Sequence, residues 1–121
     1  MQRIMVVDDD PYIIIAVREI FEEEGFEVYA CNSGRECIKE LEKGFKGVIL
    51  MDIMMPQMDG WTTIKEIINK GLHKGNIISM LSAKDLSFEK MQFEDYIKDY
   101  LTKPFESDMI IRTVKGYFDS M

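Results

Sequence analysis

The sequence predicts an α/β domain in which a five-stranded parallel sheet, doubly wound, is covered by five helices on its two faces. Strand-like and helix-like patterns alternate five times along the 121 residues. The runs at 3–7, 48–51 and 77–81 are almost wholly apolar, as in strands buried on both faces of a sheet, whereas the run at 97–101 is a modest, edge-like strand. Such alternation requires right-handed crossovers, and these place helices on both faces. The expected strands cover residues 3–7, 26–30, 48–51, 77–81 and 97–101.

The first two helices have clear start and stop signals. Asp10 and Pro11 supply a side-chain cap and a first-turn proline for a helix that Gly25 ends. Ser33 and Glu36 then form a capping box that opens the second helix. Both helices therefore fit between neighbouring strands.

The remaining helices are expected after the central strand. Asp59 can cap the third helix and Gly71 can end it. Residues 84–95 have mixed apolar spacing and are expected to form a fourth helix. Ser107 can cap the last helix.

Length and composition favour one cytoplasmic domain over residues 1–121, with no output domain. A chain of 121 residues can bury about two thirds of its unfolded surface in one core. Its apolar runs are too short for a membrane span or a secretory signal. The net charge of −7 opposes binding to nucleic acid. Cys31 and Cys37 lack metal or redox spacing and are expected to be free, structural thiols.

Polar side chains follow four of the expected strands at their carboxyl ends. They are Asp8, Asp9, Asp52, Ser82 and Lys103. In open α/β sheets the ligand site lies at these ends. A single polar residue after a strand is ordinary turn composition, but four strand ends together predict a site.

The chemistry of this set is that of a phosphoryl acceptor. Three crowded carboxylates repel one another unless a cation neutralises them, and all-oxygen ligands favour Mg²⁺ or Mn²⁺. Lys103 can pair with the central carboxylate when no phosphoryl group is present. Asp52, on the central strand, is the natural nucleophile for forming an acyl phosphate.

Four motifs stand in order along the chain: Val-Val-Asp-Asp-Asp-Pro at 6–11, Leu-Met-Asp-Ile-Met-Met-Pro-Gln-Met-Asp-Gly at 50–60, Leu-Ser-Ala at 81–83 and Tyr-Leu-Thr-Lys-Pro-Phe at 100–105. With them the chain resembles the receiver domain of two-component response regulators over essentially its whole length. The resemblance implies the flavodoxin-like strand order 2-1-3-4-5. It also implies a regulatory domain, phosphorylated by a sensor histidine kinase or phosphotransfer protein, that catalyses only its own phosphoryl transfer and slow dephosphorylation.

The resemblance also assigns the metal site and the acceptor. By it, Asp8 and Asp9 are the acidic metal pair and Asp52 is the phosphoacceptor and a metal ligand. The main-chain carbonyl of Met54 is implied as a further Mg²⁺ ligand.

The switch residues follow from the same resemblance. Ser82 and the backbone of Ala83 are implied to bind the phosphoryl group, with Lys103 on another oxygen. Tyr100 is implied to move with Ser82, changing the surface of helix 4, strand 5 and helix 5 for a downstream partner. The bond before Pro104 is expected to be cis.

The stretch before the fifth strand departs from the family, since Tyr96 and Ile97 stand where receivers usually carry small residues. This leaves the geometry of the fourth helix and the docking surface open.

The main alternative is a receiver-like binding module that works without phosphorylation. A haloacid-dehalogenase-type phosphatase is disfavoured because its nucleophile ends the first strand, and a flavin carrier because three aspartates would repel phosphate. The kinase, the target, phosphoryl lifetime, dimerisation on phosphorylation, and whether the chain was excised from a longer one stay open.

Overall fold

The computed structural model, which describes residues 2–82 and 92–121, has the predicted doubly wound α/β fold. All strand pairs in its sheet are parallel. The strand order is β2-β1-β3-β4-β5, as expected. The strands are β1 (Arg3–Val7), β2 (Glu27–Cys31), β3 (Val48–Asp52), β4 (Ile77–Ser82) and β5 (Asp99–Thr102).

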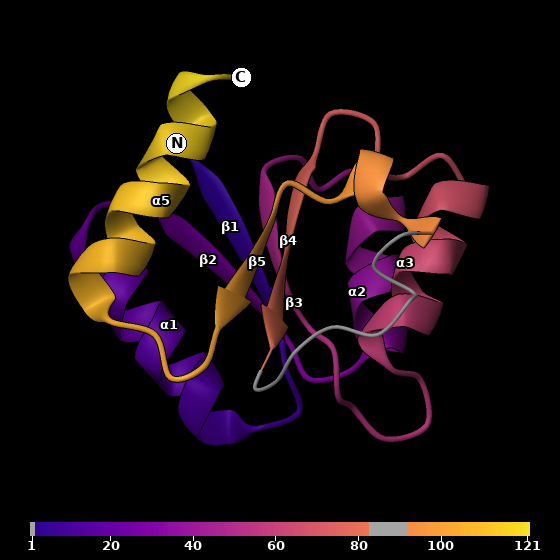
Figure 1. Ribbon diagram of the computed structural model, residues 1–121, viewed down its shortest axis with the longest axis horizontal. Coiled ribbons are helices and arrows are strands. Elements are labelled where there is room, and N and C mark those ends of the chain that lie inside the picture. The colour runs from indigo at the N-terminus through magenta and orange to yellow at the C-terminus, as the bar shows by residue number, and fades with distance from the viewer. Residues whose placement is uncertain (1, 83–91) are drawn as a thin grey trace.

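Helices cover both faces of this sheet (Figure 1). The described ranges hold α1 (Pro11–Glu23), α2 (Gly34–Glu42), α3 (Gly60–Asn69), α5 (Ser107–Asp119) and a short 3-10 helix, η1 (Glu94–Tyr96). Helices α1 and α5 lie on one face, and α2 and α3 lie on the other. The fourth helix, expected over 84–95, falls mostly outside the described residues, and the described ranges hold four of the five expected α-helices.

Two apolar cores result, one on each side of the sheet. Successive side chains of a strand point to opposite faces. Ile4 and Val6 of β1 therefore pack with the residues of α1 and α5. Met5 and Val7 pack with those of α2 and α3. All four side chains are fully buried, which explains why the strand reads as an unbroken apolar run.

The predicted caps of the first two helices are present. Asp10 accepts a hydrogen bond from the backbone N–H of Tyr12 at 2.9 Å. Ser33 accepts one from the N–H of Glu36 at 3.1 Å. The carboxylate of Glu36 reaches back to the N–H of Asn32 at 2.8 Å. The turns that follow β1 and β2 are thus fixed by side chains named from the sequence.

The expected cap of the last helix was wrong. Glu106 is the N-cap residue of α5 and makes no side-chain capping bond, while Ser107 is the first helical residue. The reason is that helical hydrogen bonding begins one residue earlier, since the N–H of Ile110 donates to the carbonyl of Glu106 at 3.0 Å.

Cys31 and Cys37 are both free and buried. In the part of the chain that the structure describes, no helix has the length and apolar character needed to cross a membrane.

Candidate functional site

The carboxyl edge of the sheet brings together three of the predicted residues. Asp8 directly follows β1, Asp52 is the last residue of β3, and Lys103 directly follows β5. The Nζ atom of Lys103 lies 2.8 Å from Oδ2 of Asp8 and 3.1 Å from Oδ1 of Asp52. One ammonium group therefore bridges two carboxylates from neighbouring strands.

The Asp8 carboxylate is fixed on both of its oxygens. Its Oδ2 accepts from Lys103, and its Oδ1 accepts from the backbone N–H of Asp10 at 2.9 Å. The side chain is 1% exposed. Asp10 in turn caps α1, so the start of that helix holds Asp8 in place.

Burial and charge oppose each other at Asp52. Burial, followed by the charge of Asp8, raises the pKa of Asp52 to about 6, while Lys103 and the backbone N–H of Met54 lower it. At neutral pH the carboxylate is therefore ionised, and it is poorly hydrated. These are properties of a competent oxygen nucleophile.

Lys103 keeps its charge in this setting. Burial alone lowers the pKa of Lys103, but its hydrogen bonds to Asp8 and Asp52 outweigh burial and raise the pKa overall. A fixed cation therefore stands beside the acceptor oxygen, where the negative charge of a phosphoryl group would develop.

The acidic residues can also hold a metal. Asp8, Asp9 and Asp52 each offer a carboxylate oxygen, and these oxygens lie within 4.8 Å of one another. Asp9 is exposed while the other two are buried. An all-oxygen set that opens to solvent fits Mg²⁺, which keeps several of its waters.

The loop after β3 is closed tightly beside this cluster. The N–H of Gly60 donates to the carbonyl of Ile53 at 2.8 Å. Ile53 and Met55 are buried, whereas Met54 between them is 77% exposed. Gln57 has a φ of 67°, the left-handed conformation that a tight turn uses. The loop thus anchors its apolar side chains inward and places the Met54 backbone next to Asp52.

The predicted switch residues lie on β4 and β5, the next two strands of the sheet after the β3 strand that carries Asp52. Ser82 is the last residue of β4, and its carbonyl accepts from the N–H of Lys103 at 2.7 Å. Tyr100, on β5, is half-buried on the α3 side, with its ring 6.4 Å from that of Trp61. The Lys103–Pro104 peptide bond is cis. Ala83 lies outside the described residues.

Sequence reasoning missed two residues that shape the site. A Cβ at Gly60 would overlap the carbonyl oxygen of Asp52 and lie 2.9 Å from Cα of Ile53. Trp61 stacks on Phe93 with ring centroids 5.8 Å apart and an interplanar angle of 15°. The glycine directly after the Asp59 cap was a usable signal for the first, but no local pattern reports the second.

A doubly wound sheet with an acidic cluster and a lysine at its carboxyl edge defines a class of metal-assisted phosphoacceptor domains. The sequence model of the response regulator receiver domain matches residues 4–115. The chain therefore belongs to this family and is a receiver domain of two-component response regulators. Receiver domains are regulatory domains.

Individual relatives agree. A CheY-like response regulator receiver domain protein from Methanospirillum hungatei is 43% identical, with a TM-score of 0.91 over 96% of this chain and 93% of its own. The response regulator TrrA from Thermotoga maritima, solved with Mg²⁺ and BeF, is 30% identical, with a TM-score of 0.82 over 96% of this chain and 98% of its own. The chemotaxis protein CheY from Bacillus subtilis is 31% identical over 93% of each chain.

Other relatives are longer. The chain spans about half the length of several transcriptional regulators that it matches. The phosphorylation-independent alternative is not favoured, because the family match is joined by an intact Asp8, Asp9 and Asp52 cluster that suits phosphorylation and Mg²⁺.

Proposed function

We propose that Asp52 accepts a phosphoryl group from a phosphohistidine, and that this modification switches the surface formed by β5 and α5. The observation that carries the proposal is the bridging of Asp52 and Asp8 by Lys103, at 3.1 Å and 2.8 Å, beside a cluster of carboxylate oxygens. Such an arrangement supplies a nucleophile, a cation and a metal site within one small volume.

In the transfer step, a carboxylate oxygen of Asp52 attacks the phosphorus of the donor. The bond between phosphorus and the donor imidazole nitrogen breaks, and the imidazole leaves as its neutral form after taking up a proton from solvent. Lys103 moves its hydrogen bond from the carboxylate to a phosphoryl oxygen. No change in the fold of the sheet is needed for this exchange of partners.

Mg²⁺ would be held by Asp8, Asp9, Asp52 and the carbonyl of Met54. The ion would neutralise negative charge on the oxygens of the phosphoryl group during transfer. The receiver TrrA, 30% identical to this chain, was solved in complex with Mg²⁺ and BeF, which supports a Mg²⁺ site here. Mn²⁺ has the same preference for oxygen ligands.

After transfer, Ser82 and the backbone of Ala83 would bind further phosphoryl oxygens. Tyr100 would then follow into the space vacated, which biases the domain toward a second conformation. Its position against Trp61, at 6.4 Å, gives it a defined packing partner from which to move. Slow hydrolysis of the acyl phosphate, by the domain itself, would reset the switch.

The partners follow from this role. The donor would be a sensor histidine kinase or a phosphotransfer protein. The target would be a downstream protein or an attached output domain, with a phosphorylation-dependent dimer as a further option. We place the domain, as a single unit over residues 1–121, in the cytoplasm with its kinase. The net charge of −7 disfavours direct contact with nucleic acid.

Intact mass after incubation with acetyl phosphate and Mg²⁺ tests the proposal. We expect a labile gain of a single phosphoryl group that is lost with a metal chelator and in Asp52→Asn. The Asp10→Asn variant is the matched control, since Asp10 caps α1 and contributes no oxygen to the cluster. No gain with either acetyl phosphate or a phosphorylated histidine kinase would contradict the proposal.

A further inference from the structure

The first turn of α2 is packed against the start of α3 through a buried glycine. Gly34 is the first residue of α2, and a Cβ at this position would overlap Oγ1 of Thr63. The same Cβ would lie 3.2 Å from both Cγ and Sδ of Met58. Gly34 does not have a positive φ, so the position needs glycine for space and not for its backbone angle.

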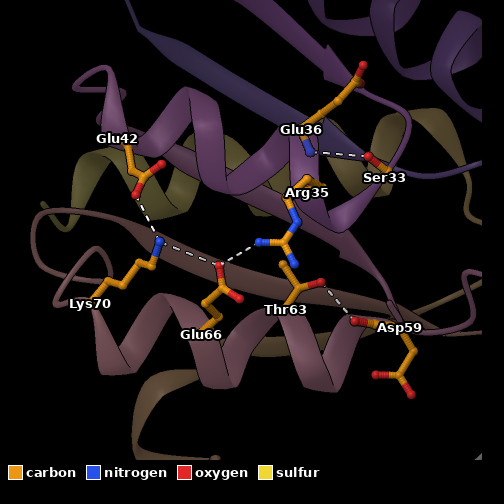
Figure 2. A network of polar contacts seen from close by, with 8 residues as sticks. All are labelled: Ser33, Arg35, Glu36, Glu42, Asp59, Thr63, Glu66 and Lys70. Carbon is orange, nitrogen blue, oxygen red and sulfur yellow. Dashed lines mark hydrogen bonds and ion pairs between the residues drawn. The ribbon is translucent and has the colours of Figure 1, made fainter. Parts of the chain in front are cut away.

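Thr63 is in turn hydrogen-bonded to Asp59, which ends the loop that follows β3. Its side chain is fully buried, and its Oγ1 donates to the carbonyl of Asp59 at 2.8 Å (Figure 2). The backbone N–H of Thr63 donates to the same carbonyl at 3.0 Å. Asp59 also caps α3 by accepting from the N–H of Thr62 at 2.8 Å. Asp59 is therefore fixed relative to α3 by three hydrogen bonds.

The loop between Asp52 and Gly60 has little freedom of its own. It is closed by the bond from Gly60 to Ile53 at 2.8 Å and contains a tight turn in which the N–H of Met58 donates to the carbonyl of Pro56 at 2.7 Å. Met58, like Thr63, has a side chain that a Cβ at Gly34 would meet. A displacement of α2 would therefore reach the Met54 backbone through a short, closed segment.

A row of ion pairs continues the α2–α3 contact away from the site (Figure 2). Arg35 lies 3.2 Å from Glu66, and Lys70 lies 2.9 Å from Glu42 and 3.7 Å from Glu66. These groups are substantially exposed, and such pairs contribute little each. These pairs join the two helices at the surface, whereas the Gly34–Thr63 contact joins them in the interior.

We propose that the Gly34–Thr63 contact positions the loop of residues 53–59 and thereby sets the affinity of the acidic site for Mg²⁺. The inference rests on the proposed function, because it assumes that Asp52 and the Met54 carbonyl take part in metal binding. Gly34 and Thr63 are positioning residues and touch neither metal nor phosphoryl group. The physical reason is that Mg²⁺ demands near-octahedral geometry, so a small shift of one ligand weakens the whole site.

The variant Gly34→Ala tests the inference, with Gly116→Ala as its matched control. Gly116 lies in α5, and, apart from its chain neighbours and the adjacent backbone of its own helix, no described heavy atom lies within 4 Å of the position that a Cβ would take there, so its substitution adds the same methyl group without a clash. We expect Gly34→Ala to bind Mg²⁺ about tenfold more weakly by calorimetric titration, as is usual when groups that orient metal ligands are altered. We also expect faster amide hydrogen exchange over residues 53–60 in metal-free protein. Gly116→Ala should change neither quantity.

Changes at Thr63 provide a second test that does not depend on the folding of Gly34→Ala. Thr63→Ala loses the hydroxyl that holds Asp59, while Thr63→Ser keeps it. We expect faster exchange over residues 53–60 and weaker Mg²⁺ binding in the alanine variant only. Removing the hydroxyl also removes the overlap, so Gly34→Ala combined with Thr63→Ala should bind Mg²⁺ as Thr63→Ala does alone.

The wild-type titration separates failure of this inference from failure of the proposed function. Absence of Mg²⁺ binding by the wild type would overturn both. Wild-type binding with an unchanged dissociation constant in both Gly34→Ala and Thr63→Ala would overturn the positioning role alone. Where Gly34→Ala does not fold, equal Mg²⁺ affinity and equal loop exchange in Thr63→Ala and Thr63→Ser would overturn it as well.

Discussion

The Nζ atom of Lys103 lies 3.1 Å from Oδ1 of Asp52 and at the same time donates to Asp8 at 2.8 Å. The two carboxylates come from neighbouring strands and are almost fully buried, with side chains 8% and 1% exposed. Buried charges of one sign are tolerated only when they are paired. Lys103 is thus the internal counter-ion of the acidic edge, and it is available to a phosphoryl group once a metal takes over part of that role.

Replacing this lysine should destabilise the metal-free protein strongly. We expect Lys103→Met to lower the free energy of unfolding by about 3 kcal/mol, because removing one partner leaves buried charges uncompensated. Lys115→Met is the control, since Lys115 pairs with Glu24 at the surface and should cost less than about 1 kcal/mol. Urea unfolding in the presence of a chelator measures both. Equal, small losses would show that the buried pairing contributes nothing.

The raised pKa of Asp52 makes a prediction about stability and pH. With a pKa of about 6 in the folded state and about 3.9 in the unfolded chain, the folded protein holds this proton more tightly. The contribution of Asp52 to stability is therefore complete below about pH 4 and is lost as the pH rises through 6. At neutral pH the ionised carboxylate costs on the order of 3 kcal/mol.

Asp52→Asn should consequently stabilise the metal-free protein at pH 7.5, and the gain should vanish by about pH 4. Urea unfolding at the two pH values measures the difference. Asp119→Asn, at the exposed end of α5, is the control and should shift stability by less than about 0.5 kcal/mol. A gain of the same size at both pH values would mean that the ionisation of Asp52 is not its cause.

A buried hydrogen-bonded chain fastens α5 to the sheet. The hydroxyl of Ser79 donates to that of Tyr117 at 2.7 Å, and the hydroxyl of Tyr117 donates to the carboxylate of Asp99 at 2.7 Å. Tyr117→Phe would leave both neighbours without this partner, at a cost of about 1–3 kcal/mol. Tyr12→Phe, at a side chain 80% exposed, should have no measurable effect. Chemical denaturation compares the two variants, and equal free energies of unfolding would rule out a structural role for the Ser79–Tyr117–Asp99 hydrogen bonds.

The fluorescence of Trp61 can report the proposed movement of Tyr100. Trp61 is the only tryptophan, and its ring contacts both Phe93 and Tyr100. If Tyr100 changes its position on phosphorylation, the emission of Trp61 should change. The change should be absent in Asp52→Asn and strongly reduced in Tyr100→Ala. Constant emission in a wild-type sample that is phosphorylated by mass would contradict the coupling.

The sheet could be predicted well because its central strands β1, β3 and β4 are largely apolar runs that end at, or directly before, a polar residue. Val7 and Met51 precede aspartates, and the observed strands β1 and β3 end within one residue of the expected positions. The fifth strand was expected from residue 97, but it begins at Asp99. Ile97 is buried and so fits the apolar pattern, yet pairing with β4 starts only where Ser79 faces Asp99. Hydrogen-bond register is not encoded in local hydrophobicity.

The site was predictable to the extent that it depends on strand ends. The meeting of Asp8, Asp52 and Lys103 follows from a parallel sheet, whose carboxyl ends share one edge. The pairing of Lys103 with Asp8 as well as with the central carboxylate did not follow, because it depends on how far the lysine side chain reaches from the end of β5, past β4 and β3, toward the end of β1. The Gly34–Thr63 contact had no signal at all, since it arises where two helices approach in three dimensions.

Identifying the phosphorylated residue tests the central claim most directly. After incubation with acetyl phosphate and Mg²⁺, borohydride reduces an aspartyl phosphate to homoserine, which peptide mass spectrometry can locate. Homoserine at position 52 alone, and none without Mg²⁺, is the result that the account predicts. Modification at Asp8 or Asp9, or an unmodified Asp52 in a protein that has gained a phosphoryl group, would contradict it.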